Sequence, residues 1–557
     1  MPFTYGIVTA DGVLRAWQRA CINKLDESGL SQLRCIIDAK TSPQERQQRE
    51  AFDRFARGAL SLAQEPLRDL IAEYPQAVSM EVSGLSFAAA QMHALQTSAL
   101  DFVLCFGPRQ LGLQISTTPK FGVWVFSHGD ITKFESPLAG FWELYYDHDV
   151  TGAALLALTG ADVMGVVLKA GYLRTVRTSF ERNADFVLNE LAMWPTHVCR
   201  DLSAGLASYS ADKPQPKAPA TFGFPTAAQC RSVRARARKN RAKQQFQQRF
   251  YLPDWTIGVL DASPADFVGT EAQAGVSEIL PYERGRFVAD PFVIHRAGKA
   301  FVFCELYLYK KNRGVIAVSE WEAPGVRRLT TVIEEPYHLS YPQVFEHDGS
   351  VYCLPESVDQ KKVCLYKAID FPYRWENVHT LLEDFAAVDS TLLQFQNRWW
   401  LFCTNLDEGY HSHLYIWSSD DLFGPWKPHP RNPVKIDVRS SGPAGPFFSN
   451  KGQLYRPAQD CARVYGGLVR INRVDVLSET DFKETVVGAI RPPRGRYDRG
   501  IHTVASSQGL CMVDVLRDVF EPRAIAGLFT GSVGAVARRA GVPATTIQAW
   551  KKRLGMS

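Results

Sequence analysis

The sequence predicts two folded domains of different class: an α/β domain with a doubly wound sheet, then an all-β five-bladed β-propeller with a short helical tail. Three observations predict this. Strand-like and helical patterns alternate over residues 1–207, a Pro- and Lys-rich linker and a basic helix occupy 208–254, and five related segments follow within 255–520. At 557 residues the chain is too long for one hydrophobic core.

The first domain begins with the apolar run "YGIVTADG", which we expect to form a strand that ends in a turn. Leu14, Trp17, Cys21 and Leu25 then recur at helical spacing. The runs "LRCIIDAK" and "LDFVLCFG" are two further buried strands. Strands that alternate with helices in this way predict a parallel, doubly wound sheet.

The propeller is predicted by a repeat in which a small or polar motif opens two apolar strands joined by a turn. The repeats are anchored at Asp290, Tyr341, Asp389, Ala444 and His502, at intervals of 51, 48, 55 and 58 residues. These intervals fit a four-stranded blade, and five blades fit residues 255–520. We expect "WTIGVLD", at 255–261, to close the ring by pairing with the last blade.

Two segments lie outside these domains. The helix predicted over 231–249 carries eight Lys or Arg and no acid, which is typical of a solvated helix and also fits contact with anionic lipid or nucleic acid. The tail, 521–557, resembles a helix-turn-helix and is otherwise a two-helix cap on the propeller. Apart from that alternative for the basic helix, only this tail would make nucleic acid a partner, and for the tail we expect the cap.

The composition indicates an ordinary globular protein. A net charge of +5 gives no reason to expect nucleic-acid or membrane binding by the molecule as a whole. The eleven cysteines include no C-x-x-C pair and mostly lie in apolar runs, which indicates free thiols in a reducing compartment. Because the sequence shows no signal peptide and no apolar run of about 18 residues, we expect a cytoplasmic location.

Residues 5–205 resemble the formyltransferase fold family, through "LDFVLCFG", "GVWVFSHGD", "SPLAGFWELYYDHDVTGAAL" and "MGVVL". The resemblance implies N10-formyltetrahydrofolate as a possible cofactor, and an Asn, His and Asp triad. Those slots hold Val125, Ser127 and Val163, which cannot stabilise an oxyanion or move a proton. We therefore expect a degenerate domain.

A rearranged triad of His128, Asp130 and Asp162 is the alternative. These residues lie one to three positions from the missing ones, and a shift of one residue on a strand turns a side chain to the opposite face. A structural role for His128 is the simpler interpretation.

The propeller resembles the N-terminal domain of plant glucosamine inositolphosphorylceramide transferases and their bacterial relatives, and five-bladed glycosidase propellers. The resemblance rests on "ADPF", "YHLSYPQVFEHDG", "PES", "DSTL", "GPWKPHPRNPV", "LYRPAQDCARVYGG" and "GIHT". It implies a site for a sugar, glycan or nucleotide-sugar at the mouth of the central channel. In those plant proteins a separate domain is the glycosyltransferase.

Glycoside cleavage needs two carboxyls that face each other across a sugar. Asp290 and Asp389 occupy equivalent first-strand positions and are the candidate catalytic pair, although both could instead only fix the blades. A further acid expected in blade two is replaced by "SYP". The candidate sugar-binding residues are Glu305, His338, Glu356, Arg456, Arg499 and His502.

No metal site is expected, because His411 and His413 have no third ligand at suitable spacing. The leading hypothesis is a glycan-binding or carbohydrate-active protein of surface-polysaccharide or glycolipid assembly, with a degenerate formyltransferase domain. The alternatives are an active N-formyltransferase on an amino sugar and a glycosidase-like hydrolase. Whether the chain is an enzyme stays open: a formyl or glycosyl transferase is the first choice and a glycoside hydrolase the second.

Overall fold

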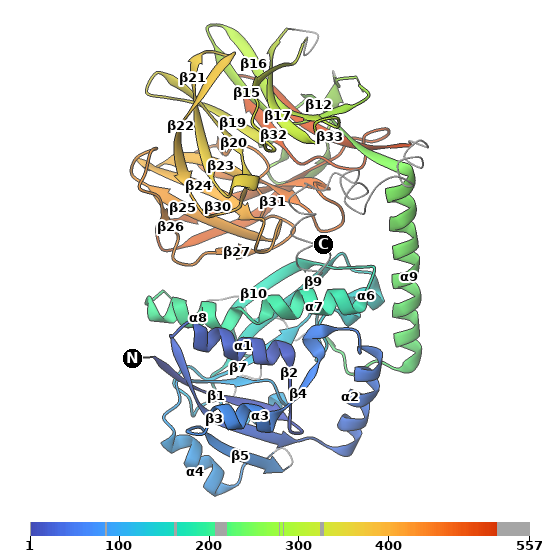
Figure 1. The fold of residues 1–557 in the computed structure, drawn as a ribbon, viewed down its shortest axis with the longest axis vertical. Helices are drawn as coiled ribbons and strands as arrows, with labels where there is room; N and C mark the ends of the chain where they lie inside the picture. The colour runs from blue at the N-terminus through green and yellow to red at the C-terminus, as the bar shows by residue number, and fades with distance from the viewer. Residues whose placement is uncertain are drawn as a thin grey trace. The chain divides into compact units, whose positions relative to one another are not determined.

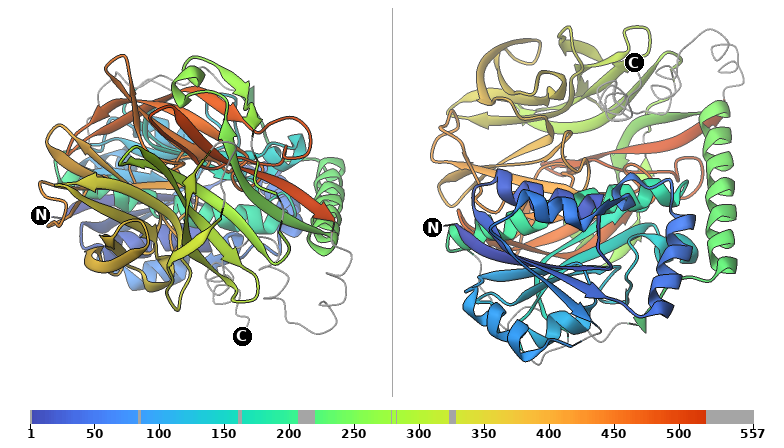
Figure 2. Two further views of the ribbon diagram at one scale, coloured as in Figure 1. Left: turned by 90° about the horizontal axis from the view of Figure 1, so that it is seen from above. Right: turned by 60° about the horizontal axis from the view of Figure 1, so that its bottom comes forward.

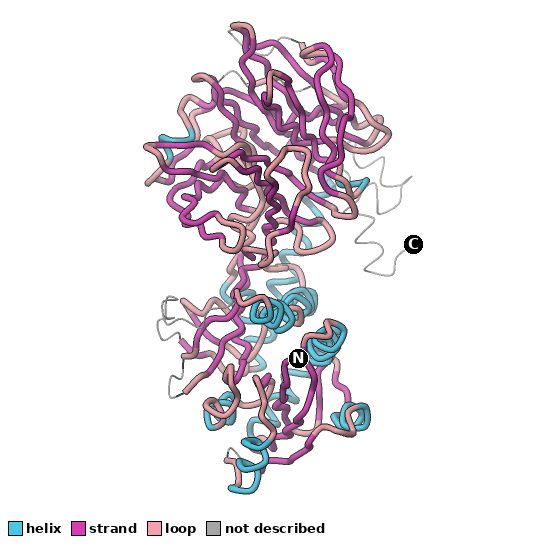
Figure 3. The backbone as a smooth tube through the Cα atoms, turned by 90° about the vertical axis from the view of Figure 1, so that its left-hand side faces the viewer, coloured by secondary structure: helices cyan, strands magenta, loops and turns pink. Residues whose placement is uncertain are grey.

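A computed structural model describes residues 2–83, 86–160, 164–206, 220–277, 279–281, 283–322 and 328–520. The chain divides into two compact units, Met1–Ala242 (unit 1) and Lys243–Ser557 (unit 2). Most helices belong to unit 1, whereas strands joined by loops make up most of the described part of unit 2 (Figure 3). Asp162 and the predicted tail at 521–557 lie outside the described residues.

Unit 1 is built on one mixed sheet. Its strands are β1 (Phe3–Ala10), β2 (Val13–Arg15), β3 (Ser31–Lys40), β4 (Gln64–Pro66), β5 (Val78–Ser83), β6 (Phe102–Cys105), β7 (Val123–His128), β9 (Val150–Leu158) and β10 (Val166–Arg174). The main order is β5-β3-β1-β6-β7-β9-β10, and the pairs from β5 to β7 are parallel. The predicted parallel sheet is thus confirmed at its centre, but β9 and β10 form an antiparallel edge.

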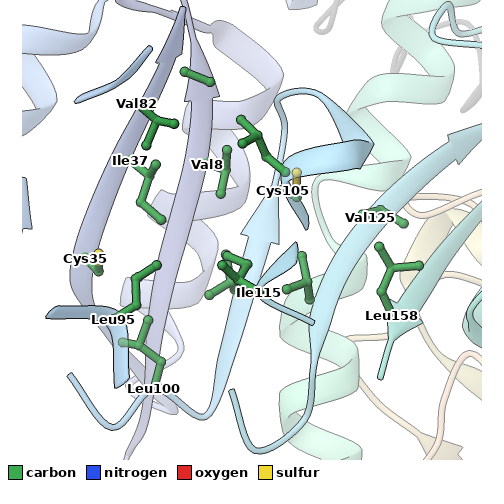
Figure 4. Close-up of a cluster of buried hydrophobic side chains, with 14 of the residues drawn as sticks. Val8, Cys35, Ile37, Val82, Leu95, Leu100, Cys105, Ile115, Val125 and Leu158 are labelled. Atoms are coloured by element: carbon green, nitrogen blue, oxygen red, sulfur yellow. The ribbon is translucent and has the colours of Figure 1, made fainter. Parts of the chain in front are cut away.

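Helices cover both faces of this sheet. They are α1 (Ala16–Glu27), α2 (Pro43–Phe55), α3 (Leu67–Glu73), α4 (Ala89–Thr97), α5 (Arg109–Gln114), α6 (Phe141–Tyr146), α7 (Phe180–Leu191) and α8 (Trp194–Ser203), with a short 3-10 turn η1 (Leu60–Leu62). Helices α1, α7 and α8 pack along one face (Figure 1). On the other face Leu95 of α4 and Leu111 of α5 join a buried cluster with Val8, Ile37 and Val125 (Figure 4). Strands β8 (Phe134–Glu135) and β11 (Ala220–Thr221) form a separate pair.

The first turn follows the sequence prediction closely. Asp11 and Gly12 have φ of 60° and 70°, as a two-residue hairpin requires, and they join β1 to β2. The predicted helix begins at Ala16, because Val13–Arg15 is taken up as strand β2, which pairs with β4. Trp17, Cys21 and Leu25 are buried on the face of α1 that the pattern indicated.

The basic helix is α9 (Ala227–Phe250), and it is largely solvated. Its buried side chains are Val233 and Ala237. Within unit 1, Arg234 donates to the carbonyl of Phe55 and stacks over the Phe55 ring. No described helix is both long enough and apolar enough to cross a membrane.

Unit 2 is a five-bladed β-propeller, viewed from above on the left of Figure 2. Blade one holds β15 (Arg286–Arg296), β16 (Lys299–Leu308), β17 (Arg313–Trp321) and β18 (Thr330–Ile333). Blade two holds β19 (Ser340–His347), β20 (Ser350–Glu356), β21 (Val363–Asp370) and β22 (Arg374–Leu382). Blade three holds β23 (Ala387–Phe395), β24 (Arg398–Asn405), β25 (His413–Ser419), β26 (Lys427–Pro428) and β27 (Lys435–Ile436).

The last two blades complete the ring. Blade four holds β28 (Phe448–Asn450), β29 (Gln453–Asp460), β30 (Leu468–Leu477), β31 (Phe482–Arg491) and β13 (Glu271–Gln273). Blade five holds β32 (Val504–Ser507), β33 (Leu510–Phe520), β12 (Tyr251–Leu260) and β14 (Val276–Ser277). The 3-10 turns η2 (Pro264–Phe267) and η3 (Val358–Gln360) lie in connections. Strand β12, which contains most of "WTIGVLD", pairs antiparallel with β33, so the predicted closure is confirmed.

The cysteines are free, and all but Cys230 are buried. Inside the strands they pack as small apolar side chains: Cys304 lies in the cluster between β12, β15 and β16, and Cys403 in the cluster between blades two and three. The sequence prediction of buried free thiols is confirmed.

Candidate functional site

The first strands of blades one, two and three share one distortion. Asp290, Tyr341 and Asp389 have φ of 52°, 45° and 53°, in the left-handed region that such residues rarely adopt. At each position the pairing with the next strand slips, which is a β-bulge. Three of the five repeat anchors read from the sequence are therefore structurally equivalent. Strain of about 1–3 kcal/mol per residue persists only where the surroundings fix it.

Hydrogen bonds between blades hold these bulges. The Asp290 carboxylate accepts from the Tyr341 backbone N–H at 3.2 Å and from the Thr503 hydroxyl at 2.8 Å, so it joins blades one, two and five. The Tyr341 hydroxyl bonds to Thr391 at 2.9 Å and accepts from the Gly445 N–H at 2.6 Å. Asp290 therefore holds neighbouring blades together, which is one of the two roles considered for it.

The bulges of blades one and three turn Asp290 and Asp389 toward a cavity of about 70 Å³ in the propeller. Since one water needs about 10–15 Å³, the cavity has room for roughly five waters or for part of a sugar ring. Four carboxyls line it, those of Asp290, Glu305, Glu356 and Asp389. The other lining residues are chiefly aromatic: Trp255, Phe287, Tyr307, Tyr309, His338, Tyr410, Tyr465 and His502.

One carboxyl of the cavity is kept ionised. His502 lies between two carboxylates, with its Nε2 3.2 Å from Asp290 and its Nδ1 2.9 Å from Asp514. Burial opposes both charges, but Asp514 and Asp290 raise the pKa of His502 well above its ordinary value. His502, Thr503 and the Tyr341 N–H in turn hold the pKa of Asp290 below its ordinary value, against burial.

The pKa values of the other three carboxyls are raised, the opposite of the shift at Asp290. Burial, and then the charges of Asp290 and Glu356, raise the pKa of Glu305 well above its ordinary value. Burial and the charges of Glu356 and Asp290 do the same for Asp389. Burial raises the pKa of Glu356 to about 8, although its Oε2 accepts from the Asp389 N–H at 3.0 Å. The cavity therefore combines one ionised carboxyl with three that favour the protonated form.

Of the four carboxyls, Glu305 is the one whose hydrogen bonding is least complete. Its side chain is 7% exposed, and its Oε1 has no hydrogen-bond partner among the described residues. The nearest ring nitrogen, His338 Nε2, is 3.5 Å away. His338 is neutral at ordinary pH, because burial lowers its pKa to about 4, and its Nδ1 accepts from the Gly314 N–H.

Two predicted binding residues do not line this cavity. Arg456 is fully buried, but its guanidinium pairs with Glu484 and donates to the carbonyls of Ser440 and Ser441. Arg499 is 40% exposed and pairs with Asp518 at 2.8 Å. Both predictions assumed that a polar side chain near a repeat anchor faces the mouth of the central channel. Instead, ion pairs with Glu484 and Asp518 hold the two arginines away from the cavity.

Sequence reasoning missed Asp514, Trp255, Tyr410 and Tyr465. Asp514 is fully buried in β33, and it accepts from the backbone N–H groups of Asp290, His502 and Thr503. Its one signal is a carboxylate inside the apolar run "CMVDVL". The rings come from loops and from the closing strand, which the repeat pattern does not align.

Asp290, His502 and Asp514 are also the one group of three metal-ligand types found close together among the described residues, within 4.8 Å. The two ring nitrogens of His502 face different carboxylates, so the ring forms an ion pair on each side. A single ion could not replace both contacts, because it would bind only one of the two nitrogens.

Unit 1 contains a second cavity, of about 570 Å³. It opens at the carboxyl ends of β1, β6 and β7, and Trp17, Phe106, Phe126 and His128 are among its lining residues. His128 is 7% exposed and contacts Trp17 edge to face. Burial lowers the pKa of His128 to about 4, and its Nδ1 has no hydrogen-bond partner among the described residues.

Of the proposed rearranged triad, the structure describes His128 and Asp130, and no hydrogen bond or ion pair is found between these two residues. Asp130 bonds to the Thr132 hydroxyl at 2.7 Å and lies 3.0 Å from Lys133 Nζ, and these contacts, despite burial, lower its pKa. Val125 lines the cavity at the slot where the resemblance implies Asn, and the Ser127 hydroxyl has no hydrogen-bond partner among the described residues. Asp162 is outside the described residues.

Fold and site together define unit 2 as a five-bladed propeller with an acidic, aromatic-lined central cavity. Residues 275–497 match the family described as "Glucosamine inositolphosphorylceramide transferase 1, N-terminal". The rice (Oryza sativa subsp. japonica) glucosamine inositolphosphorylceramide transferase 1 is 34% identical over 270 residues, 42% of this chain and 36% of that protein. The Arabidopsis thaliana protein of the same name is 32% identical over 213 residues, 36% of this chain and 27% of that protein.

The chain spans about a third of the length of these curated relatives. Solved structures with some likeness include a β-xylosidase (RS223) at 12% identity and TM-score 0.33, covering 44% of this chain and 86% of that one. Another is a family 117 glycoside hydrolase from Zobellia galactanivorans at 12% identity and TM-score 0.32, covering 49% and 94%. TM-scores this low support no functional conclusion.

Proposed function

We propose that the propeller binds a sugar residue of a glycan or glycolipid in its central cavity. The observation that carries this proposal is the set of four buried carboxyls and surrounding aromatic rings at one end of the first strands. Carboxyl groups accept and donate hydrogen bonds to sugar hydroxyls, and the faces of Trp255 and the tyrosines suit the C–H faces of a sugar ring. The unpartnered Oε1 of Glu305 is a ready acceptor for a ligand hydroxyl or amine.

A role in glycolipid or surface-glycan assembly is the biological setting we propose. It is supported by the match of residues 275–497 and by the names of the plant relatives. The test of binding is titration of the full chain with a panel of monosaccharides and short glycans, followed by calorimetry. Asp389→Asn should weaken binding at least tenfold, because it removes a carboxyl that lines the cavity.

The matched control is Asp460→Asn. Asp460 is equally buried in the same propeller, but it pairs with Arg470 and does not line the cavity. Binding should survive this change. Loss of binding in both variants, or in neither, would contradict the proposal.

Glycoside hydrolysis is a second candidate, favoured by the opposed pKa directions. Asp290 would act as the ionised base or nucleophile, and a protonated carboxyl such as Asp389 or Glu305 as the acid. The test is sugar release from a glycan panel. Asp290→Asn should stop release and leave sugar binding measurable; binding without turnover in the unmodified chain refutes hydrolysis.

For unit 1 we propose a formyltransferase-like domain that has lost transfer activity. His128 stays neutral and its Nδ1 has no partner in the described part of the chain, while Asp130 bonds to Thr132 and Lys133. These two residues therefore do not fit transfer from N10-formyltetrahydrofolate. Formyl transfer to an amino-sugar nucleotide that His128→Ala abolishes would overturn this proposal.

A further inference from the structure

Helix α9 is strongly basic along its whole length. Its 24 residues, Ala227–Phe250, include eight Lys or Arg and no acid. Three of the eight, Arg234, Arg236 and Arg241, contact other residues of unit 1. The other five are exposed and form no hydrogen bond or ion pair with another described residue: Arg231, Arg238, Lys239, Lys243 and Arg249.

These five exposed cations lie on one side of the helix, and we call them the basic stripe. At about 3.6 residues per turn, their positions fall within one sector of α9, away from its buried side chains Val233 and Ala237. Phe246 lies in the same sector and is 55% exposed. The stripe therefore presents positive charge and one aromatic ring to the solvent.

The charges of the basic stripe repel one another. Lys239 and Lys243, for example, are four residues apart, and like charges at this spacing destabilise a helix. A helix that is simply solvated usually has acids between its bases, whereas α9 has none. An anionic partner would neutralise the stripe and remove this repulsion. At about 1.5 Å per residue, that partner would carry negative charge over roughly 27 Å, from Arg231 to Arg249.

Aromatic side chains gather at the C-terminal end of α9. The ring of Phe246 lies 4.7 Å from that of Phe250 and 6.3 Å from that of Tyr251. Phe520, at the end of β33, is 57% exposed, and its ring contacts the same two rings at 6.4 and 5.5 Å. Exposed aromatic rings beside Lys and Arg are typical of the boundary between lipid headgroups and acyl chains. The phosphate backbone of a nucleic-acid duplex offers no such apolar layer.

We propose that α9 docks the protein on an anionic lipid surface. The basic stripe contacts the headgroups, and Phe246 and Phe520 enter the boundary between headgroups and acyl chains. This inference is independent of the sugar-binding function, because no residue of the stripe or of the aromatic cluster lines the propeller cavity.

The test is co-sedimentation of the full chain with vesicles of phosphatidylcholine alone and of phosphatidylcholine mixed with phosphatidylglycerol. The protein should bind the mixed vesicles, and salt should weaken that binding by screening the charges. Arg238→Gln, Lys239→Gln and Lys243→Gln combined should lower partitioning about a hundredfold, since each basic residue near an anionic surface contributes about fivefold. Phe246→Ala should lower it roughly fivefold, as expected for burying about half of a phenylalanine side chain.

The matched control combines Lys310→Gln, Arg374→Gln and Lys427→Gln. These side chains are exposed on the propeller, and the change in net charge is the same. Partitioning of this variant should stay close to that of the unmodified chain. Glutamine is a good helix former, so circular dichroism should show that α9 survives its own three substitutions.

Four results would overturn the inference. The first is equal binding, or no binding, to the two kinds of vesicle. The second is binding that survives the triple substitution in α9, or that falls equally in the control. The third is tighter binding to duplex DNA than to mixed vesicles at the same salt, which assigns the stripe to nucleic acid. The fourth is a dimer that sedimentation shows to dissociate in the α9 variant, which assigns the stripe to a second copy of the chain.

Discussion

Replacing Glu356 by glutamine should make the propeller more stable at neutral pH. The Glu356 carboxyl is 7% exposed, and burial raises its pKa from 4.5 to about 8. The folded state therefore keeps a proton that the unfolded chain loses above pH 4.5, so stability falls as the pH rises toward 8. At 1.36 kcal/mol per pH unit, the interval from 4.5 to 7 costs about 3 kcal/mol.

Glu356→Gln removes this loss and keeps an oxygen that can accept from the Asp389 N–H. The variant and the unmodified chain should unfold at similar temperatures near pH 4.5. At pH 7 the variant should unfold roughly 6 to 12 °C higher, since about 3 kcal/mol shifts a domain of this size by that amount. Calorimetric scans at both pH values measure the difference. If the difference in unfolding temperature between the two proteins does not grow with pH, the prediction is refuted, because Glu356 would then ionise alike in the folded and unfolded states.

Three further predictions concern single side chains. Tyr341→Phe should lower the free energy of unfolding of the propeller by about 1–3 kcal/mol, because it leaves the buried Gly445 N–H without its acceptor. An unchanged thermal unfolding temperature would contradict the role of Tyr341 in holding the blades together. Arg456→Met should destabilise the propeller by about 1–3 kcal/mol, since the buried Glu484 loses Arg456 and keeps Lys435 as a cationic partner. Sugar affinity should persist; loss of affinity would place Arg456 at the site. His128 should stay neutral above pH 5, because burial lowers its pKa to about 4. Unit 1 should therefore lose stability as the pH falls from 6.5 toward 4, and His128→Gln should reduce that loss. A His128 pKa near 6.5 in an NMR titration would refute this prediction.

The propeller could be predicted because each repeat has a recognisable short-range sequence pattern. Period-two apolar runs and turn residues mark each hairpin, and the anchors Asp290, Tyr341 and Asp389 prove to occupy equivalent bulges. The closing strand was predictable because an open ring would leave an unpaired edge. In unit 1 the alternation predicted the parallel centre, but it could not reveal that β9 turns back antiparallel to β7.

The candidate site was predictable only in part. Asp290, Asp389, Glu305, Glu356, His338 and His502 all line the cavity, since each lies at a fixed place in the repeat. Arg456 was misplaced because its partner, Glu484, comes from an outer strand of the same blade. Asp514 was missed because an apolar strand gives no sign that one of its side chains pairs with a histidine just before the neighbouring strand β32.

The most direct test of sugar binding by the propeller is a crystal structure of the full chain soaked with a monosaccharide that binds it in calorimetry. We expect density for that sugar at the propeller cavity, with a hydroxyl within hydrogen-bond distance of Glu305 and the ring against Trp255 or a tyrosine of the wall. Sugar density in the cavity of unit 1 and none in the propeller would contradict it.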